Sequence, residues 1–394
     1  MQRQIASQAD LSAQWRTSGG NSRAGAAPLV AVVLPPREGF GPGRTGAIGL
    51  IAHRLGAAPG FRTMVIGGQQ AGPTFTGTEF HTARPPFWLP GNINTRYAAG
   101  VARLLHRLQP ALIEVHNRPE VALALARRLP AARISLFLHN DPQSMRSARS
   151  PAERHALLSR MAGVVTVSDY LRRRLLEGVA ASPMVPVVLP NCIDLSTLPP
   201  PRQRERIILF VGRVVPEKAP DAFVAACAIV LPRLPGWRAE IIGADRSRAD
   251  SPDTRFVRGV RDAAQAAGVA LLGYRDHPEV LAALAGASIV VVPSRWQEPF
   301  GLTALEAMAS GAALVCSPRG GLPEVAGDAA LYADPDDPAA LAEAIIALAS
   351  DDARRDGLAE AGRGRAQMFD LPPTLASLAS LRHAILATFR HGRA

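Results

Sequence analysis

Short apolar, β-branched segments alternate with longer helical patterns along almost the whole chain. Segments of this kind predict strands buried on both faces, and their alternation with helices predicts parallel sheets covered by helices on both sides. The alternation runs through two halves without an internal repeat, so the predicted fold is α/β with two Rossmann-like domains. The expected strands are 29–34, 62–66, 112–115, 134–138, 164–167 and 185–189 in the first half, and 207–211, 239–242, 270–272, 289–292 and 313–316 in the second.

The length of the chain agrees with two domains, because 394 residues exceed what one hydrophobic core usually holds. The Pro-rich stretch 198–204 is a plausible linker between them. We expect a polar, disordered tail over 1–27, a first domain over 28–197 and a second domain over 205–370. The last segment, 371–394, has a helical pattern and is able to pack back on the first domain.

Composition disfavours several classes of protein. No apolar run approaches the ~20 residues of a membrane-spanning helix, and the N-terminus lacks the apolar region of a signal peptide. The three cysteines, Cys192, Cys227 and Cys316, lie far apart and form neither a disulfide pattern nor a metal-ligand pattern. We therefore expect a protein of a reducing compartment, the cytoplasm.

The positive charge of the chain is concentrated in its first half. The formal net charge is +11, and residues 1–200 hold 22 arginines against 10 acidic residues. Nucleic acid, the anionic inner leaflet of a membrane and a phosphorylated or acidic acceptor are compatible partners, and so is an arginine-rich composition without a special partner. Aromatic residues are only 5% of the chain and do not interleave with the arginines, so nucleic acid is not the expected partner.

The segment from Ser294 to Glu306 carries the strongest functional signal. It follows the expected strand 289–292 and leads into a helix expected over 302–310. Glu298 then lies at the carboxyl end of a parallel strand, where open α/β sheets bind ligands. The unpaired backbone N–H groups at the helix start are able to hold an anion, and Glu306 lies about one turn further on. Two carboxylates beside an anion-binding helix start suit a sugar nucleotide.

Lys218 is the only lysine among the 44 basic residues. It comes shortly after the expected strand 207–211, behind the pair Gly212-Arg213. An ammonium group is a compact point charge with three donors, whereas a guanidinium binds phosphate oxygens in pairs. Arg213 and Lys218 together form a reasonable clamp for a diphosphate, although a single lysine on a solvated turn would also arise by chance.

Two further strand ends in the first half carry candidate residues. A Gly-rich loop with Gly41, Gly43 and Gly46 follows the first strand, where it either lets the backbone approach a ligand or forms a flexible turn. The loop lacks the GxGxxG pattern of dinucleotide binding. His116 and His139 each end a strand, where either side chain would bond to sugar or phosphate groups or serve as an ordinary polar residue.

We expect no bound metal ion. The acidic run Asp334-Pro-Asp-Asp337 immediately precedes a helical pattern, and N-capping explains it. His139, at a strand end, has no His, Cys or carboxylate partner four residues away.

These residues together make the second half resemble the retaining GT-B glycosyltransferases of family 4. The resemblance rests first on Glu298 and Glu306, which are separated by seven residues. The segments 115–119 and 138–142 are similar to those of bacterial lipopolysaccharide-core and exopolysaccharide transferases. Cys192 stands where the family usually has glycine. The supporting elements are Pro299-Phe300-Gly301, Gly212-Arg213 with Pro216-Glu217-Lys218, Gly273-Tyr274, Gly320-Gly321 with Pro323-Glu324, and Pro190-Asn191 with Ile193-Asp194.

The resemblance implies two Rossmann-like domains facing across a cleft, and roles for individual residues. Arg213 and Lys218 would neutralise the departing diphosphate. Glu298 would orient the transferred sugar or stabilise positive charge on its anomeric carbon, and Glu306 would bind the ribose hydroxyls. His139 would contact the sugar from the opposite domain, and no metal or other cofactor is implied. The implied donor-binding residues are Gly212, Arg213, Lys218, Tyr274, Pro299, Phe300, Gly301, Leu302, Thr303 and Glu306, and those on the acceptor side are Gly41, Gly43, Gly46 and His116.

The function implied by the resemblance is transfer of a sugar, with retention of its anomeric configuration, from a nucleotide-sugar donor to a glycan, glycolipid or phosphorylated acceptor. A UDP-sugar is the favoured donor and GDP-mannose the next, and the pathway would be envelope polysaccharide or lipopolysaccharide biosynthesis at the inner face of the cytoplasmic membrane. Two alternatives stay open: a sugar-nucleotide epimerase or hydrolase on the same scaffold, and a non-catalytic polyanion-binding protein, which the isoelectric point near 10.8 would allow.

Overall fold

The computed structural model describes residues 26–86, 88–246 and 250–388, and nearly all of the expected tail over 1–27 lies outside them. The chain divides into two compact units. The first unit runs to Cys192 and takes up the chain again at Leu371, and the second unit is Ile193–Asp370. The final segment therefore groups with the first unit.

The boundary between the units precedes the Pro-rich stretch 198–204 that the sequence suggests as a linker. Backbone contacts explain this. The N–H of Ile193 donates to the carbonyl of Phe369 at 2.9 Å, and the N–H of Leu195 donates to the carboxylate of Asp370 at 3.2 Å. These bonds attach the start of the second unit to its own end, a long-range pairing that no local pattern marks.

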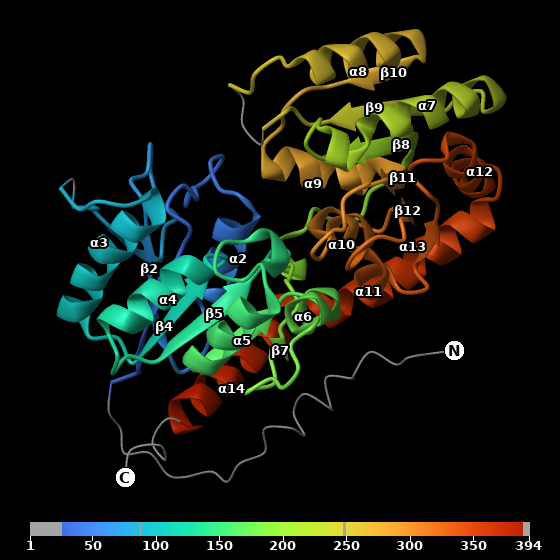
Figure 1. Ribbon diagram of the computed structural model, residues 1–394. Coiled ribbons are helices and arrows are strands. Elements are labelled where there is room, and N and C mark those ends of the chain that lie inside the picture. Colours follow the sequence, from blue (N-terminus) through green and yellow to red (C-terminus); the bar gives the residue numbers. More distant parts are fainter. Residues whose placement is uncertain (1–25, 87, 247–249, 389–394) are drawn as a thin grey trace. The chain divides into compact units, whose positions relative to one another are not determined.

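The first unit is built on a seven-stranded parallel sheet with the order β3-β2-β1-β4-β5-β6-β7 (Figure 1). The predicted strands are confirmed, although the last one is shorter than expected. An additional edge strand, β3, was not predicted because it has only one large apolar residue, Phe80, instead of an apolar run. The strands are β1 (Leu29–Val33), β2 (Arg62–Gly67), β3 (Glu79–Thr82), β4 (Leu112–His116), β5 (Ile134–Leu138), β6 (Gly163–Thr166) and β7 (Val187–Val188).

Helices cover both faces of this sheet. The helices α3 (Ile93–Leu108), α4 (Pro119–Arg128), α5 (Pro151–Arg160) and α6 (Asp169–Leu176) bury their apolar residues against one face. The helices α2 (Ala47–Leu55) and α14 (Leu371–Thr388) pack on each other and on the opposite face. Period-two alternation in the strands separates the two sides: Val115 points into the first core, while its neighbour Glu114 meets Arg382 of α14.

The second unit has a six-stranded parallel sheet with the order β10-β9-β8-β11-β12-β13. The predicted strands are again confirmed, and the short edge strand β13 is additional. Figure 1 shows α7 and α8 on one side of β8 and β9, and α9 on the other. The strands are β8 (Glu205–Val211), β9 (Arg238–Ile242), β10 (Val269–Leu271), β11 (Ala287–Val292), β12 (Ala313–Cys316) and β13 (Ala330–Tyr332). The helices are α7 (Pro220–Val230), α8 (Arg255–Ala266), α9 (His277–Gly286), α10 (Leu302–Ala309), α11 (Leu322–Ala326), α12 (Pro338–Ala349) and α13 (Asp352–Ala366).

Candidate functional site

Neighbouring strand ends bring several candidates of the second unit to one edge of its sheet. Gly212 and Arg213 follow β8, Gly243 follows β9, and Ser294 follows β11, with β8 lying between β9 and β11. A Cβ atom on Gly243 would lie 1.8 Å from the carbonyl oxygen of Gly212, and Gly243 has a φ of 152°. Only glycine allows these two loops to approach so closely. Gly243 was not singled out from the sequence, where only its position after the strand 239–242 marks it.

Lys218, Glu298 and Ser294 form one cluster at this edge. The Nζ atom of Lys218 lies 2.5 Å from Oε1 of Glu298, and the hydroxyl of Ser294 donates to the same oxygen at 2.5 Å. Glu298 is 5% exposed, whereas the Lys218 side chain is 23% exposed. The Nζ atom also lies 5.4 Å from the centre of the Trp296 ring. A buried carboxylate is thus held by a cation and a hydroxyl, while the cation keeps access to solvent.

The loop after β12 supports the backbone of Glu298. The N–H of Gly321 donates to the Glu298 carbonyl at 2.6 Å, and the N–H of Gly320 donates to Oε1 of Gln297 at 2.9 Å. Gly320 has a φ of 66°, and a Cβ atom there would lie 2.2 Å from the Glu298 carbonyl oxygen. The close approach that the glycine pair permits is therefore to the Glu298 loop.

Helix α10 begins without a side-chain cap among the described residues. Gly301 precedes it with a φ of 106°, so the N–H groups of Leu302 and Thr303 face outward from the first turn and are available to an anion. The Phe300 ring is buried and packs edge-on against Phe369, with 5.6 Å between ring centres. The Phe300 side chain is thus part of the core, and the Pro299-Phe300-Gly301 segment offers its backbone to a ligand.

Glu306, on the second turn of α10, is paired with a residue that the sequence did not single out. Its Oε1 lies 2.8 Å from Nε2 of His277, at the start of α9. Glu306 is 6% exposed, and His277 is partly exposed. The approach of α9 to α10 creates this pair, so no local motif predicts it.

Arg213 and Tyr274 have different surroundings from Lys218. The Arg213 side chain is exposed, and within the described ranges it makes no ion pair or hydrogen bond. Tyr274 follows Gly273 after β10, and burial, with a smaller effect of the acidic Asp276 and Glu279, raises the pKa of its hydroxyl. The Tyr274 hydroxyl is therefore protonated at neutral pH and able to donate.

His116 and His139 in the first unit are brought together. Nδ1 of His116 lies 2.9 Å from Nε2 of His139. Burial, followed by the charge of Arg382, lowers the pKa of His116 to about 3, and burial, followed by His116, holds the pKa of His139 well below its usual value. His116 is only 1% exposed, and its contact with an acceptor stays a prediction.

The Gly-rich loop packs mainly on its own unit. A Cβ atom on Gly41 would lie 2.1 Å from the carbonyl oxygen of Pro73, and one on Gly46 would lie 2.6 Å from the Glu38 carboxylate. These two glycines therefore serve close packing within the protein, while Gly43 has a φ of 66° with nothing within 4 Å of its Cβ position. A cavity of about 910 Å³ lies next to this loop. Its lining includes Pro36, Gly68, Gln70, Pro73, Phe80 and Tyr97.

Neither a metal cluster nor a membrane-spanning helix is found in the described part of the chain. Its His, Cys, Asp and Glu side chains form no group of three or more that could hold a metal ion. No helix within the same ranges is long and apolar enough to cross a membrane. The capping interpretation of the acidic run is confirmed for Asp337, whose carboxylate accepts from the N–H groups of Ala339 and Ala340, while Asp334 and Asp336 pair with Arg319.

Two family models match this chain and together cover most of it. The model "Glycosyltransferase Family 4" matches residues 50–197, and "Glycosyl transferases group 1" matches residues 199–365. The chain belongs to the family 4 glycosyltransferases. The second match contains the Lys218–Glu298 pair, the start of α10 and Glu306.

Relatives and solved structures agree with this assignment. This glycosyltransferase is 34% identical over 190 residues to the D-inositol 3-phosphate glycosyltransferase of Corynebacterium glutamicum. The matched region covers 46% of this chain and 44% of the relative. It thus matches less than half of that relative's length. Sucrose-phosphate synthase from Thermosynechococcus elongatus has a TM-score of 0.75 at 21% identity, covering 91% of this chain and all of that one (100%). Anabaena HepE in complex with UDP and glucose has a TM-score of 0.70 at 17% identity, and the match covers 90% of this chain and 99% of HepE. The two structural likenesses show that the fold is GT-B.

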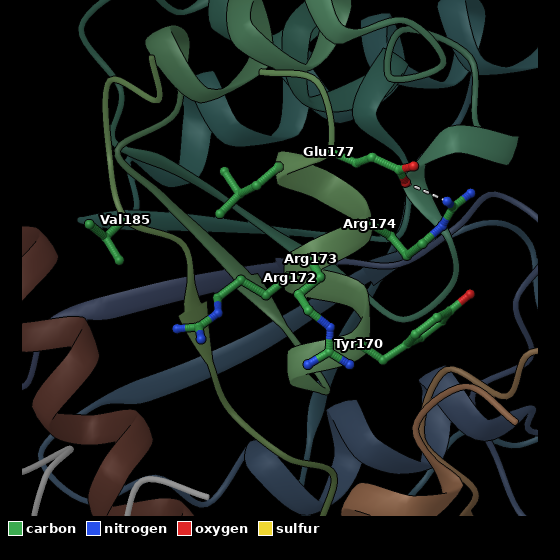
Figure 2. A pocket seen from close by; sticks show the side chains of 7 residues that line it. Tyr170, Arg172, Arg173, Arg174, Glu177 and Val185 are labelled. Atoms are coloured by element: carbon green, nitrogen blue, oxygen red, sulfur yellow. Dashed lines mark hydrogen bonds and ion pairs between the residues drawn. The ribbon is translucent and has the colours of Figure 1, made fainter. Parts of the chain in front are cut away.

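The glycosyltransferase also has a basic pocket of about 500 Å³ on α6 (Figure 2). Arg172 and Arg173 both pair with the single carboxylate of Asp169, while Arg174 pairs with Asp141 and Glu177. The charges of these three arginines and three carboxylates cancel, but the lining of the pocket itself holds the three arginines and only one acidic residue, Glu177. Val185 lies at the pocket and is 76% exposed. The surface therefore combines positive charge with an exposed apolar side chain.

Proposed function

We propose that this glycosyltransferase is a retaining enzyme that moves a sugar from a nucleotide sugar, preferably a UDP-sugar, to a glycan or glycolipid acceptor of the cell envelope. The observation that carries the proposal is the contact between Lys218, which follows β8, and Glu298, 2.5 Å apart. Glu298 lies in the same strand–loop–helix unit as the uncapped start of α10. A cation and unpaired N–H groups suit a diphosphate, and a buried carboxylate suits a sugar that becomes positive. The UDP and glucose bound by Anabaena HepE support UDP as the nucleotide.

The proposed reaction exchanges one bond of the anomeric carbon for another. The bond to the diphosphate oxygen breaks, and the nucleoside diphosphate leaves with the electron pair. The acceptor hydroxyl forms the new bond from the same face, and its proton passes to the departing phosphate oxygen, so the anomeric configuration is retained. Negative charge grows on the diphosphate, and preorganised positive groups stabilise such a transition state. Because Lys218 and Arg213 supply this charge, we propose that turnover needs no divalent metal.

The chemistry of Lys218 explains why a lysine suits this position. An ammonium group has three N–H donors, and the contact with Glu298 uses one of them. The others are available to phosphate oxygens without disturbing Glu298. The planar guanidinium of arginine is larger and would need a wider space between Glu298 and the Trp296 ring.

We assign the remaining roles by the chemistry of each group. The Glu306 carboxylate accepts hydrogen bonds from ribose hydroxyls, and His277 holds it in place from α9. The N–H groups of Leu302 and Thr303 bind the diphosphate or sugar hydroxyls. A sugar contact for His139 stays a prediction from the family resemblance.

A donor screen tests the proposal. Thermal stability and donor hydrolysis are measured with UDP, GDP and ADP sugars, with and without EDTA, for the wild type and Lys218→Ala. A ligand at 100 times its dissociation constant adds about 2.7 kcal/mol, which corresponds to roughly 2–4 °C per kcal/mol. We expect one nucleotide class to stabilise the wild type and not Lys218→Ala. The matched control is Arg354→Ala, which removes an exposed cation from α13 and should leave the shift unchanged.

The screen also separates the alternatives. The transferase proposal would be contradicted if no donor stabilised the wild type and if Lys218→Ala behaved like the wild type in both measurements. That result would favour a polyanion-binding protein. An epimerase or hydrolase would convert the donor without forming a larger glycan.

We further propose that the enzyme works at the cytoplasmic face of a membrane, because the basic pocket on α6 fits anionic headgroups.

A further inference from the structure

The first unit contains a pair of imidazole rings whose contact is built by ordered neighbours. Nδ1 of His116, at the end of β4, lies 2.9 Å from Nε2 of His139, which follows β5. The two rings are nearly parallel, at 20°. The His116 ring also stacks on Phe137, with 4.9 Å between ring centres. Oδ1 of Asn117 accepts the backbone N–H groups of His139 and Asn140, each at 3.1 Å. The His116 ring is thus held between Phe137 and His139, and the backbone of His139 is fixed by Asn117.

Each ring of the pair is neutral and carries one proton. His116 is 1% exposed and His139 is 8% exposed, and this burial lowers the pKa of both rings. A neutral imidazole has one N–H donor and one acceptor nitrogen. The contact therefore has two arrangements: His116 donates from Nδ1, or His139 donates from Nε2.

The second nitrogen of His116 distinguishes these arrangements. Its Nε2 is buried and has no hydrogen-bond partner in the described part of the chain. If His139 were the donor, His116 would carry its proton on this Nε2, as a buried N–H without an acceptor. The charge of Arg382 also disfavours an added proton on the ring, so protonation of both His116 nitrogens is no alternative. The arrangement with the proton on Nδ1 of His116 avoids a buried Nε2–H group without an acceptor.

We propose that His116 is a positioning residue that sets the tautomer of His139, by donating from its Nδ1 to Nε2 of His139. His139 then carries its own proton on Nδ1 and offers that group as a hydrogen-bond donor. A neutral N–H donor suits an oxygen atom of a sugar hydroxyl or a phosphate and is unable to act as a general base. The use of this donor on the sugar substrate rests on the proposed function, whereas the tautomer itself does not.

Nitrogen NMR measures the tautomer directly in the full chain. The protein has nine histidines, so ¹⁵N-histidine labelling gives few signals, and His139→Gln identifies the pair that belongs to His139. In the wild type we expect the shift of a protonated nitrogen at Nδ1 and that of an unprotonated nitrogen at Nε2. The reverse assignment, or an even mixture of both tautomers, would overturn the proposal without any variant of His116.

Two variants of His116 then test its part. His116→Phe keeps an aromatic ring on Phe137 and removes the donor, while His116→Asn keeps an N–H donor at the place of Nδ1. We expect a mixture of His139 tautomers and a loss of donor turnover in His116→Phe. In His116→Asn we expect a single His139 tautomer again and a recovery of donor turnover. An unchanged His139 spectrum in a folded His116→Phe protein would refute the role of His116. Absence of transferase activity in the wild type would contradict only the proposed function, because the spectra are read without turnover.

Discussion

Arg382 of the C-terminal helix α14 binds Glu114 of the central strand β4 through two hydrogen bonds, of 2.9 and 2.7 Å. Neither side chain has more than 2% exposure. The last helix of the chain is therefore joined to the sheet of the first unit by a buried ion pair. The same strand carries His116 two residues later, and the charge of Arg382 helps to lower the pKa of that imidazole.

Removing one partner of this pair should be costly. Arg382→Met leaves a buried carboxylate unpaired, which costs about 3–5 kcal/mol, whereas replacing both partners by apolar residues is often close to neutral. We expect Arg382→Met to lower the stability of the first unit strongly and the double variant Arg382→Met/Glu114→Met to recover much of it. Hydrogen exchange of the β4 and α14 amides measures the first unit separately. Equal destabilisation in the single and double variants would contradict this account.

The glycine pair behind Glu298 gives a second prediction. Gly320→Ala forces a side chain into a left-handed backbone position with a φ of 66°, against the Glu298 backbone, which costs about 1–3 kcal/mol. The matched control is Gly357→Ala in the middle of α13, where nothing lies within 4 Å of the Cβ position. This control should stabilise the helix by about 0.5–1 kcal/mol. Urea denaturation compares the two variants, and a stable Gly320→Ala protein would mean that the loop is free to move.

Local patterns were sufficient for the elements that build the second-unit site. The apolar run at 289–292 predicts β11, and the expected helix over 302–310 agrees with α10 and its terminal Gly311, which has a φ of 78°. Because ligand sites in such sheets lie at the carboxyl ends of strands, Glu298 follows from the strand position alone. Lys218 was recognisable by its rarity in an arginine-rich chain.

Contacts between distant segments were not predictable from the sequence. His277 reaches Glu306 only because α9 packs beside α10, and Gly243 matters only because its loop meets Gly212. The strand-end positions of His116 and His139 were predicted, but the burial of His116 depends on packing from other elements, including Phe137. The edge strand β3 was missed because it lacks a continuous apolar run, and β13 because its apolar run, Ala330–Tyr332, is only three residues long.

The buried imidazole of His116 predicts a pH-dependent stability of the first unit. Its pKa is about 3 in the folded protein and near 6.5 in an unfolded chain. The unfolded state therefore binds the proton first as the pH falls. Stability from the neutral ring is complete above pH ~6.5 and decreases toward pH 3, with a slope of about 1.4 kcal/mol per pH unit. His139 acts in the same direction. Unfolding measured from pH 7 to pH 4 should show a shallower decrease in His116→Phe, and an identical slope would contradict the buried neutral state.

The basic pocket on α6 predicts binding to anionic vesicles. Each arginine near such a surface contributes about 1 kcal/mol, so Arg172→Gln/Arg173→Gln should weaken binding to phosphatidylserine vesicles by roughly 30-fold. The control Arg127→Gln/Arg128→Gln removes the same charge from the exposed end of α4. Vesicle sedimentation at low and high salt measures the effect, because screening weakens a surface contact of this kind. Equal losses in both variants would mean that net charge, and not this pocket, determines binding.

The single lysine of the chain gives the most direct test of the site. Lys218→Arg keeps the charge but replaces a compact ammonium, which contacts the almost buried Glu298 at 2.5 Å, by a larger planar group. If the ammonium must reach Glu298 and a diphosphate together, kcat should fall by about 10²–10³ while the fold and the KM for the donor change little. Arg213→Lys is the matched exchange at an exposed side chain and should cost much less. Full activity in Lys218→Arg would mean that any cation suffices there, and the lysine would then be an accident of composition.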